Sequence, residues 1–253
     1  MILERAQHGQ VAVLTLNRPE AANSLNPELI RDISVTLKEI ENDLGTQVVV
    51  LTGAGEKIFC AGMDLKAFAE RSASGDEADA DAAEHTMAVG FKKPIIAAIN
   101  GAAVGGGFEL ALTCDLIVAA EHARFGLPEV KRGLFAAGGG TMLGTMIPMP
   151  LAMEAALTGE LVSAATAAQW GLVNRVVPAE QLLDAALELA NKIAANAPLG
   201  LAITKELIRR AVVDDPKRGR ATPEESAAVF DSADAVEGAT AFIEKRDPTW
   251  QGR

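Results

Sequence analysis

Residues 100–111 have the sequence Asn-Gly-Ala-Ala-Val-Gly-Gly-Gly-Phe-Glu-Leu-Ala, and this stretch decides the fold. It follows a continuous apolar run at residues 95–99, which is typical of a strand covered on both faces. Residues 100–107 are expected to form a glycine-rich loop, and residues 108–113 a short apolar helix. Three glycines before a helix leave the peptide N–H groups at its positive end accessible to a ligand. The order of buried strand, tight loop and buried helix indicates an α/β protein.

Glu109 stands in that apolar helix, where a buried carboxylate needs a partner or a chemical purpose. Glu129 follows Pro128 further along the chain, and alone it could equally be a surface acid that caps the next turn. If both carboxylates face one apolar pocket, their repulsion raises one pKa above the value of about 4.3 for a free glutamate. Such a pair supplies one acid and one base at neutral pH.

The rest of the chain alternates strand and helix patterns. Asn26 can cap a helix that begins at Pro27, and apolar residues recur at helical spacing from Ile30 to Leu44, before Gly45. Apolar runs predict further strands at residues 11–16, 47–52, 116–119 and 172–177, and helical patterns follow at about 150–157, at 163–170 and from 180 onward. The order predicts a core over residues 1–197 and a C-terminal helical region over residues 198–253.

The composition excludes several classes of protein. The 253 residues carry a net charge of −11, which disfavours sequence-independent binding to nucleic acid or to an anionic membrane. The two cysteines are far apart and no Cys/His cluster occurs, so neither a disulfide framework nor a metal site is expected. No signal-peptide core or membrane-spanning run is found, and a cytoplasmic enzyme is therefore expected. Residues 72–90 are acidic and predict either a lid or an exposed helix.

Residues 100–111, together with Cys114-Asp115 and Phe125-Gly126-Leu127-Pro128-Glu129, resemble the signature of the crotonase (enoyl-CoA hydratase/isomerase) superfamily. Further matches run nearly end to end, at residues 16–19, 50–53, 60–64, 157–159, 171–173 and 242–246. The resemblance implies an α/β fold built as a crotonase-like spiral of ββα units, with a C-terminal helical region used in trimerisation. It also implies a homotrimer, or a homohexamer made of two trimers.

The resemblance assigns roles to individual residues. Two peptide N–H groups, of Met63 and Gly106, are expected to hold the thioester carbonyl as an oxyanion hole. Glu129 is expected to give a proton to the α-carbon, and Glu109 to activate the water that adds at the β-carbon. The backbone N–H of Ala137 is expected to contact the same water.

The coenzyme A (CoA) part of the substrate is expected to lie against Glu20, Ala21, Ala22, Ala61, Gly62, Asp64, Leu65 and Lys66, mostly through backbone contacts. Lys245 either reaches the CoA phosphates in a neighbouring subunit or is an exposed lysine at a helix end. Asp64 either caps the helix that follows or contacts substrate. No metal is implied, and no cofactor beyond the CoA of the substrate.

One segment departs from the superfamily pattern. Residues 139–144 lack a Gln-Arg pair that many relatives carry, and Met142 and Met146 appear in this region. These methionines either shape an unusual acyl pocket or belong to ordinary core.

Hydratases of this family carry glutamates at both positions, so the resemblance implies an enoyl-CoA hydratase, a lyase of fatty-acid metabolism (β-oxidation) that adds water to a 2-enoyl-CoA thioester. The alternatives are an enoyl-CoA isomerase, a carnitinyl-CoA-type dehydratase, or a non-catalytic acyl-CoA-binding protein. The acidic charge disfavours RNA binding.

Overall fold

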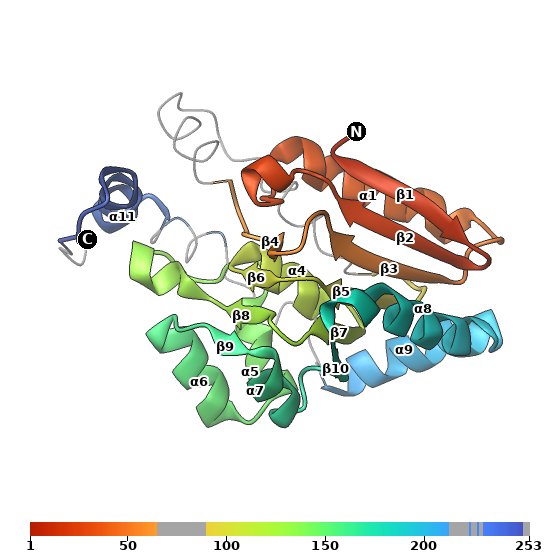
Figure 1. Ribbon diagram of the computed structural model, residues 1–253. Helices are drawn as coiled ribbons and strands as arrows, with labels where there is room; N and C mark the ends of the chain where they lie inside the picture. The colour runs from red at the N-terminus through yellow and green to blue at the C-terminus, as the bar shows by residue number, and fades with distance from the viewer. Residues whose placement is uncertain (65–89, 213–222, 224–226, 228–229, 250–253) are drawn as a thin grey trace.

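The computed structural model describes residues 1–64, 90–212, 223, 227 and 230–249, and contains two sheets (Figure 1). The larger sheet has the order β1 (Leu3–His8), β2 (Val11–Leu16), β3 (Val48–Gly53), β5 (Ile95–Ile99), β7 (Leu116–Ala120) and β10 (Arg175–Val177). Only β1 and β2 pair antiparallel, and the other neighbours are parallel. The smaller sheet has the order β4 (Ile58–Cys60), β6 (Ala102–Val104), β8 (Arg124–Gly126) and β9 (Val162–Ser163).

The larger sheet is covered on both faces, which explains the continuous apolar runs of its central strands. One face packs against α1 (Pro27–Asn42) through a stripe that includes Leu29 and Ile33. The other face packs against α8 (Leu182–Ala194) through Ala186 and Ala190. The small alanines let α8 lie close to the strands.

The chain repeatedly steps from the larger sheet to the smaller one. After β5 it enters β6, passes through α4 (Gly106–Thr113), and returns to the larger sheet at β7. Strand β3 leads into β4, and β7 into β8, in the same way. These repeated strand–strand steps bring the loops after β4, β6 and β8 side by side, because these three strands are neighbours in one sheet.

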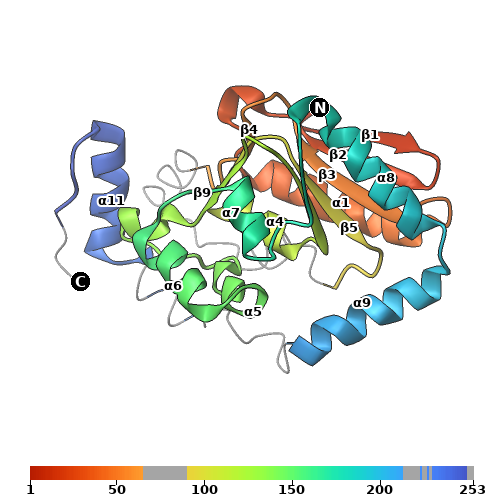
Figure 2. The same ribbon diagram turned by 60° about the horizontal axis from the view of Figure 1, so that its bottom comes forward.

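The remaining helices lie mainly in the C-terminal half. They are α5 (Leu143–Met146), α6 (Met149–Thr158), α7 (Ala164–Gln169), α9 (Pro198–Val212) and α11 (Ala233–Glu244), with 3₁₀ segments η1 (Pro19–Ala21), η2 (Pro128–Arg132), η3 (Gly140–Met142) and η4 (Ala179–Gln181). Helices α9 and α11 lie at opposite ends of the molecule (Figure 2). None of the described helices is both long enough and apolar enough to cross a bilayer.

Several predicted elements are confirmed, and others need correction. Asn26 caps α1 by accepting a hydrogen bond from the N–H of Leu29 (2.9 Å). The helix ends at Asn42, however, and Leu44 lies outside it with 89% of its surface exposed. Residues 100–107 are not all loop, because they contain β6. The strand predicted at residues 172–177 is shorter in the structure, where β10 covers only Arg175–Val177. Strand β1 was not predicted, because its side chains are mostly exposed and polar.

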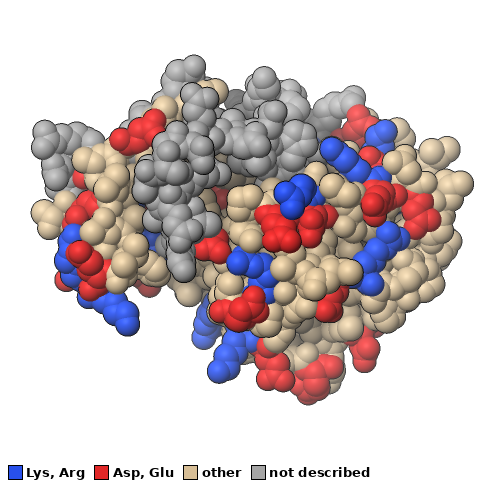
Figure 3. All heavy atoms as spheres, turned by 90° about the horizontal axis from the view of Figure 1, so that it is seen from above, with Lys and Arg blue, Asp and Glu red and all other residues tan. Residues whose placement is uncertain are grey.

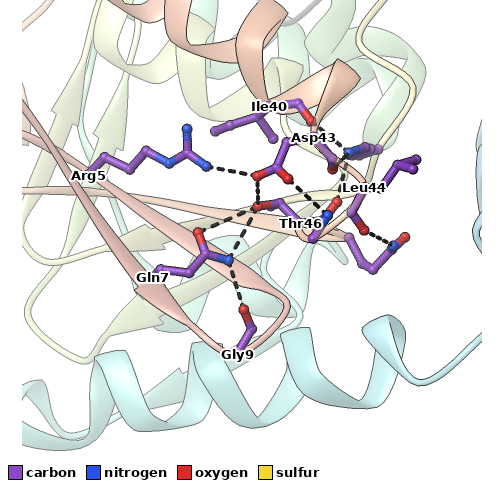
Figure 4. A network of polar contacts seen from close by, with 10 residues as sticks. Arg5, Gln7, Gly9, Ile40, Asp43, Leu44 and Thr46 are labelled. Carbon is purple, nitrogen blue, oxygen red and sulfur yellow. Dashed lines mark hydrogen bonds and ion pairs between the residues drawn. The ribbon is translucent and has the colours of Figure 1, made fainter.

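The end of α1 is tied to the edge of the larger sheet by polar contacts (Figure 4). Arg5 on β1 pairs with the Asp43 carboxylate at 3.1 Å, and the Thr46 hydroxyl donates to the same carboxylate at 2.8 Å. From the other side, Lys93 donates to the carbonyl oxygens of Ile40 (2.6 Å), Asp43 (2.6 Å) and Thr46 (2.7 Å). The ammonium group thus bridges the last turn of α1 and the segment that leads into β3.

Helix α9 is attached to the core by ion pairs. The Asp115 carboxylate, directly after α4, accepts from Lys205 at 2.8 Å and from Arg209 at 2.8 Å. The first residue of α9 is Pro198, at the predicted boundary, although the division of the chain into two regions stays a prediction. The acidic residues 72–90 lie, except for Gly90, outside the described residues.

Candidate active site

The backbone of Met63 is held by Leu25. The Leu25 N–H donates to the carbonyl of Gly62 (2.8 Å), and the Leu25 carbonyl accepts from the N–H of Asp64 (3.1 Å). Both bonds use the residues that flank Met63, as in a parallel β-bridge. The N–H of Met63 therefore points away from Leu25, and it donates to no acceptor within the described part of the chain.

Gly106, the first residue of α4, lies close to this loop. A Cβ built on Gly106 would lie 3.5 Å from the Met63 nitrogen, and one built on Gly62 would lie 2.8 Å from the Gly106 nitrogen. Gly62 also has a φ of +87°, so a larger residue would be both strained and in conflict with Gly106. The structure thus brings the two predicted donors together at the positive end of α4. In the described residues the Gly106 N–H likewise has no acceptor.

Glu109 lies in the first turn of α4 and is only 5% exposed. Its Oε1 accepts a hydrogen bond from the backbone N–H of Gly140 at 2.8 Å. Burial and then the charge of Glu129 raise the pKa of Glu109 to about 7, against the opposing effect of backbone N–H groups at Gly140 and Gly138. Near neutral pH this carboxyl can therefore either hold or release a proton.

Glu129 lies on η2, beside the glycine loop. Its Oε1 is 3.1 Å from the position that a Cβ on Gly105 would take, so the glycine makes room for the carboxylate. Gly105 also has a φ of +56°. Oε2 is buried and has no hydrogen-bond partner among the described residues, and burial raises the pKa of Glu129. The interpretation of Glu129 as a plain surface acid is therefore not supported.

The segment that holds Glu109 was missed by sequence reasoning. Gly138 and Gly140 act on the carboxylate through their backbone N–H groups. A Cβ on Gly140 would lie 2.5 Å from the Cβ of Ala136 and 3.1 Å from Oε1 of Glu109, so glycine is required there. The run of three glycines at 138–140 was the available signal. Ala137 lies in the same segment, and its contact with a water molecule stays a prediction.

The predicted CoA-binding residues lie on two adjoining loops. The N–H of Ala61 donates to the carbonyl of Ala22 (3.1 Å), which joins the loop after β4 to the loop after η1. Asn23, which sequence reasoning also missed, is 1% exposed and donates to the carbonyls of Ala54 and Ile58 at 3.0 Å each. It therefore fixes the loop on which Ala22 stands.

The other predicted contacts are placed as follows. Glu20 is exposed on η1, next to Ala21. Asp64 pairs with Arg18 at 3.3 Å, which anchors the loop that carries Met63. Lys245 is exposed at the end of α11. Leu65 and Lys66 lie outside the described residues, and contacts of all these residues with CoA stay predictions.

Cys60, the last residue of β4, is a buried free cysteine near the candidate site. Burial raises the pKa of the Cys60 thiol to about 12, so this side chain stays protonated and packs as a small apolar residue. On the face seen in Figure 3, acidic and basic side chains are interspersed rather than gathered by sign.

Two peptide donors and two carboxyl groups with raised pKa values meet at the glycine loop. This arrangement can stabilise an oxyanion and move protons beside it.

Comparison with known proteins gives matches over nearly the whole chain. The model of the enoyl-CoA hydratase/isomerase family matches residues 6–253. A carnitinyl-CoA dehydratase from Citrobacter koseri is 40% identical over 262 residues, covering 99% of this chain and 98% of the relative. The structure of a carnitinyl-CoA dehydratase from Mycobacterium avium 104 is 45% identical, with a TM-score of 0.90 over 100% of this chain and 99% of the other. An enoyl-CoA hydratase from Mycobacterium tuberculosis H37Rv is 42% identical, with a TM-score of 0.75 over 100% and 99%.

Proposed function

Because the chain belongs to the enoyl-CoA hydratase/isomerase family, we propose that it adds water to, or removes it from, the 2,3 position of a CoA thioester. The observation that carries this proposal is the pair of carboxyl groups, Glu109 and Glu129, beside two peptide N–H groups that have no acceptor among the described residues. A hydro-lyase needs a donor pair for the thioester oxygen and two proton-transfer groups. A non-catalytic protein would have no need to keep two carboxyl groups partly desolvated.

In the dehydration direction, Glu129 takes the proton from the α-carbon of a 3-hydroxyacyl-CoA. The electron pair moves into the thioester, whose oxygen becomes an enolate held by the N–H groups of Met63 and Gly106. The β-carbon–oxygen bond then breaks, and the hydroxyl leaves as water with a proton from Glu109. Hydration is the reverse, so the pair of carboxyl groups carries one proton before and after each turnover.

For the substrate, we propose a carnitinyl-CoA-type dehydratase. The curated relatives named carnitinyl-CoA dehydratase favour this choice over the enoyl-CoA hydratase predicted from sequence. A plain enoyl-CoA hydratase is the second candidate, favoured by the likeness to the Mycobacterium tuberculosis enzyme.

The test is to follow the absorbance of the conjugated enoyl thioester with two four-carbon substrates. One is crotonyl-CoA, and the other carries a trimethylammonium group on carbon 4. A kcat/KM at least tenfold higher for the cationic thioester supports the carnitinyl-type assignment. The opposite preference supports the enoyl-CoA hydratase. No absorbance change with either substrate, or with longer enoyl-CoA thioesters, overturns the hydro-lyase proposal.

The pH dependence of the reaction follows from the shared proton. Above a pH of about 7 both carboxyl groups lose their protons, and at low pH both are protonated, so kcat/KM is expected to fall on either side. The alkaline limb should lie near pH 7. Both limbs should be the same for hydration and dehydration, because adding water releases no proton and the ratio of the two kcat/KM values is a pH-independent equilibrium constant. A flat profile between pH 6 and pH 9 would contradict the shared-proton pair.

The oligomeric state, the role of Lys245, the cofactor requirement and the cellular location extend this proposal. We propose that the chain forms a homotrimer or homohexamer, which sedimentation velocity measures directly, and that Lys245 reaches the CoA of a neighbouring subunit in that assembly. The CoA of the substrate is proposed as the only group required besides the protein. A cytoplasmic location and a role in β-oxidation remain part of the same proposal.

A further inference from the structure

Two buried side-chain atoms lack a hydrogen-bond partner among the described residues: Oε2 of Glu129 and Nε of Arg132. Both residues belong to η2, in positions i and i+3. Residues with this spacing lie on the same side of a 3₁₀ helix, so the two side chains share one environment. The described residues show no direct ion pair between these two side chains. A buried, unsatisfied charged group is costly, so this arrangement must be imposed by its surroundings.

Helix α11 supplies those surroundings. A Cβ on Gly238 would lie 2.0 Å from the carbonyl oxygen of Arg132, so the helix backbone packs directly on η2 at that point. The ring of Phe242, one turn further along α11, covers the guanidinium, with 4.8 Å between Cζ and the ring centroid. Arg132 also donates from Nη1 to the carbonyl of Pro128 at 3.4 Å. The guanidinium is therefore fixed between η2 and α11, on the segment that carries Glu129.

The other basic side chains described on η2 and at the end of α11 differ from Arg132, because each is either ion-paired or exposed. Lys131 pairs with Glu160, and Arg246 pairs with Glu237 (2.6 Å) and Glu244 (2.6 Å). The remaining ionisable groups on these elements are Glu109 on α4, Glu154 on α6, Asp234 on α11 and Lys245 at the end of α11. Of the cations described on η2 and α11, Lys245 is exposed, and only Arg132 is partly buried without an ion pair.

We propose that Arg132 is a positioning residue, held in place by α11, that stabilises the ionised form of Glu129 and so sets the pH range in which this carboxylate accepts a proton. This inference rests on the proposed hydro-lyase function. Burial raises the pKa of Glu129, and the charge of Arg132 acts in the opposite direction. The packing of α11 on η2 thereby couples the C-terminal helix to the acid–base group, through Phe242 and Gly238.

The test compares Arg132→Gln with Lys131→Gln, which removes the neighbouring cation of the same 3₁₀ segment. Without the guanidinium, Glu129 holds its proton to higher pH, so the acidic limb of kcat/KM should move up by about half a unit to one unit. Arg132→Lys keeps a positive charge and should restore most of the shift. Lys131→Gln should leave both limbs in place. A folded Arg132→Gln enzyme whose acidic limb stays within 0.2 unit of the wild type would overturn the proposal.

A second variant and a direct titration of Glu129 complete the test. If Arg132→Gln does not fold, Phe242→Leu is used instead, because it removes the ring that covers the guanidinium and leaves the positive charge. This variant should move the acidic limb of kcat/KM in the same direction by a smaller amount. No movement of that limb counts against the proposal. The titration of the Glu129 carboxyl is also followed by ¹³C NMR in unliganded protein, with the resonance assigned from its loss in Glu129→Gln. A shifted titration in Arg132→Gln without any turnover of enoyl-CoA thioesters would uphold the role of Arg132 while rejecting the proposed function.

Discussion

Replacement of Glu129 by glutamine is expected to lower kcat for either direction of the reaction by about 10³-fold, within the usual range for a general acid or base. Glutamine has nearly the same shape, so the thioester still binds and KM should change little. It cannot take a proton from the α-carbon or return one, because its amide does not titrate. The measurement is the rate of change in enoyl-thioester absorbance, at saturating substrate and at the pH optimum of the wild type.

The matched control is Glu154→Gln, which alters an exposed glutamate on α6 and should keep the wild-type rate. The stability of the Glu129 variant provides a second check. Because burial raises the pKa of Glu129 in the folded state, folding favours its protonated form, and this carboxyl becomes more destabilising as the pH rises through the folded pKa. Glu129→Gln should therefore unfold at a higher urea concentration than the wild type at pH 8. A variant that retains more than a tenth of the wild-type kcat would remove Glu129 from the acid–base pair.

The burial of the Glu109 carboxyl group could be predicted from sequence, whereas its surroundings could not. A glutamate in the run Phe-Glu-Leu-Ala-Leu is conspicuous, because a helix buried on all sides has no solvent for a carboxylate. The donors that hold it come from the segment around Gly140, which folds back onto α4. Nothing in the spacing of the two segments indicates that contact, because it depends on the tertiary packing of η3 against α4.

The elements themselves were predicted where one physical signal dominated. Strand β5 has five buried apolar residues, and Asn26 with Pro27 gives a helix start that needs no tertiary help. Strand β6 was missed because its three residues lie between glycines and are stabilised by β4 and β8 on either side. The end of α1 was placed too late because Leu44 continues the apolar spacing, although its side chain contributes nothing to the core.

The proposed oxyanion hole depends on the backbone N–H of Gly106, which can be removed by a single substitution. Gly106 is the first residue of α4, a position where proline is favoured, and the preceding Gly105 has no Cβ to clash with the proline ring. Gly106→Pro thus deletes the N–H donor and places a ring carbon where the thioester oxygen would bind. We expect kcat/KM to fall about 10²- to 10³-fold relative to Gly106→Ala, the usual effect of losing one such donor.

Gly106→Ala is the matched control, because it adds a carbon and keeps the N–H. Its Cβ would lie 3.5 Å from the Met63 nitrogen and 3.6 Å from Cδ1 of Leu25, both ordinary contacts, so we expect less than about a tenfold loss. Thermal unfolding should show that both variants are folded. Met63→Leu changes only a side chain that is 40% exposed and should stay within about twofold of the wild type, because the hole uses the peptide and not the thioether. Equal activity of the proline and alanine variants would mean that the Gly106 N–H does not bind the oxygen. Met63 would then be the only remaining member of the predicted donor pair, and the family geometry would not extend to this chain.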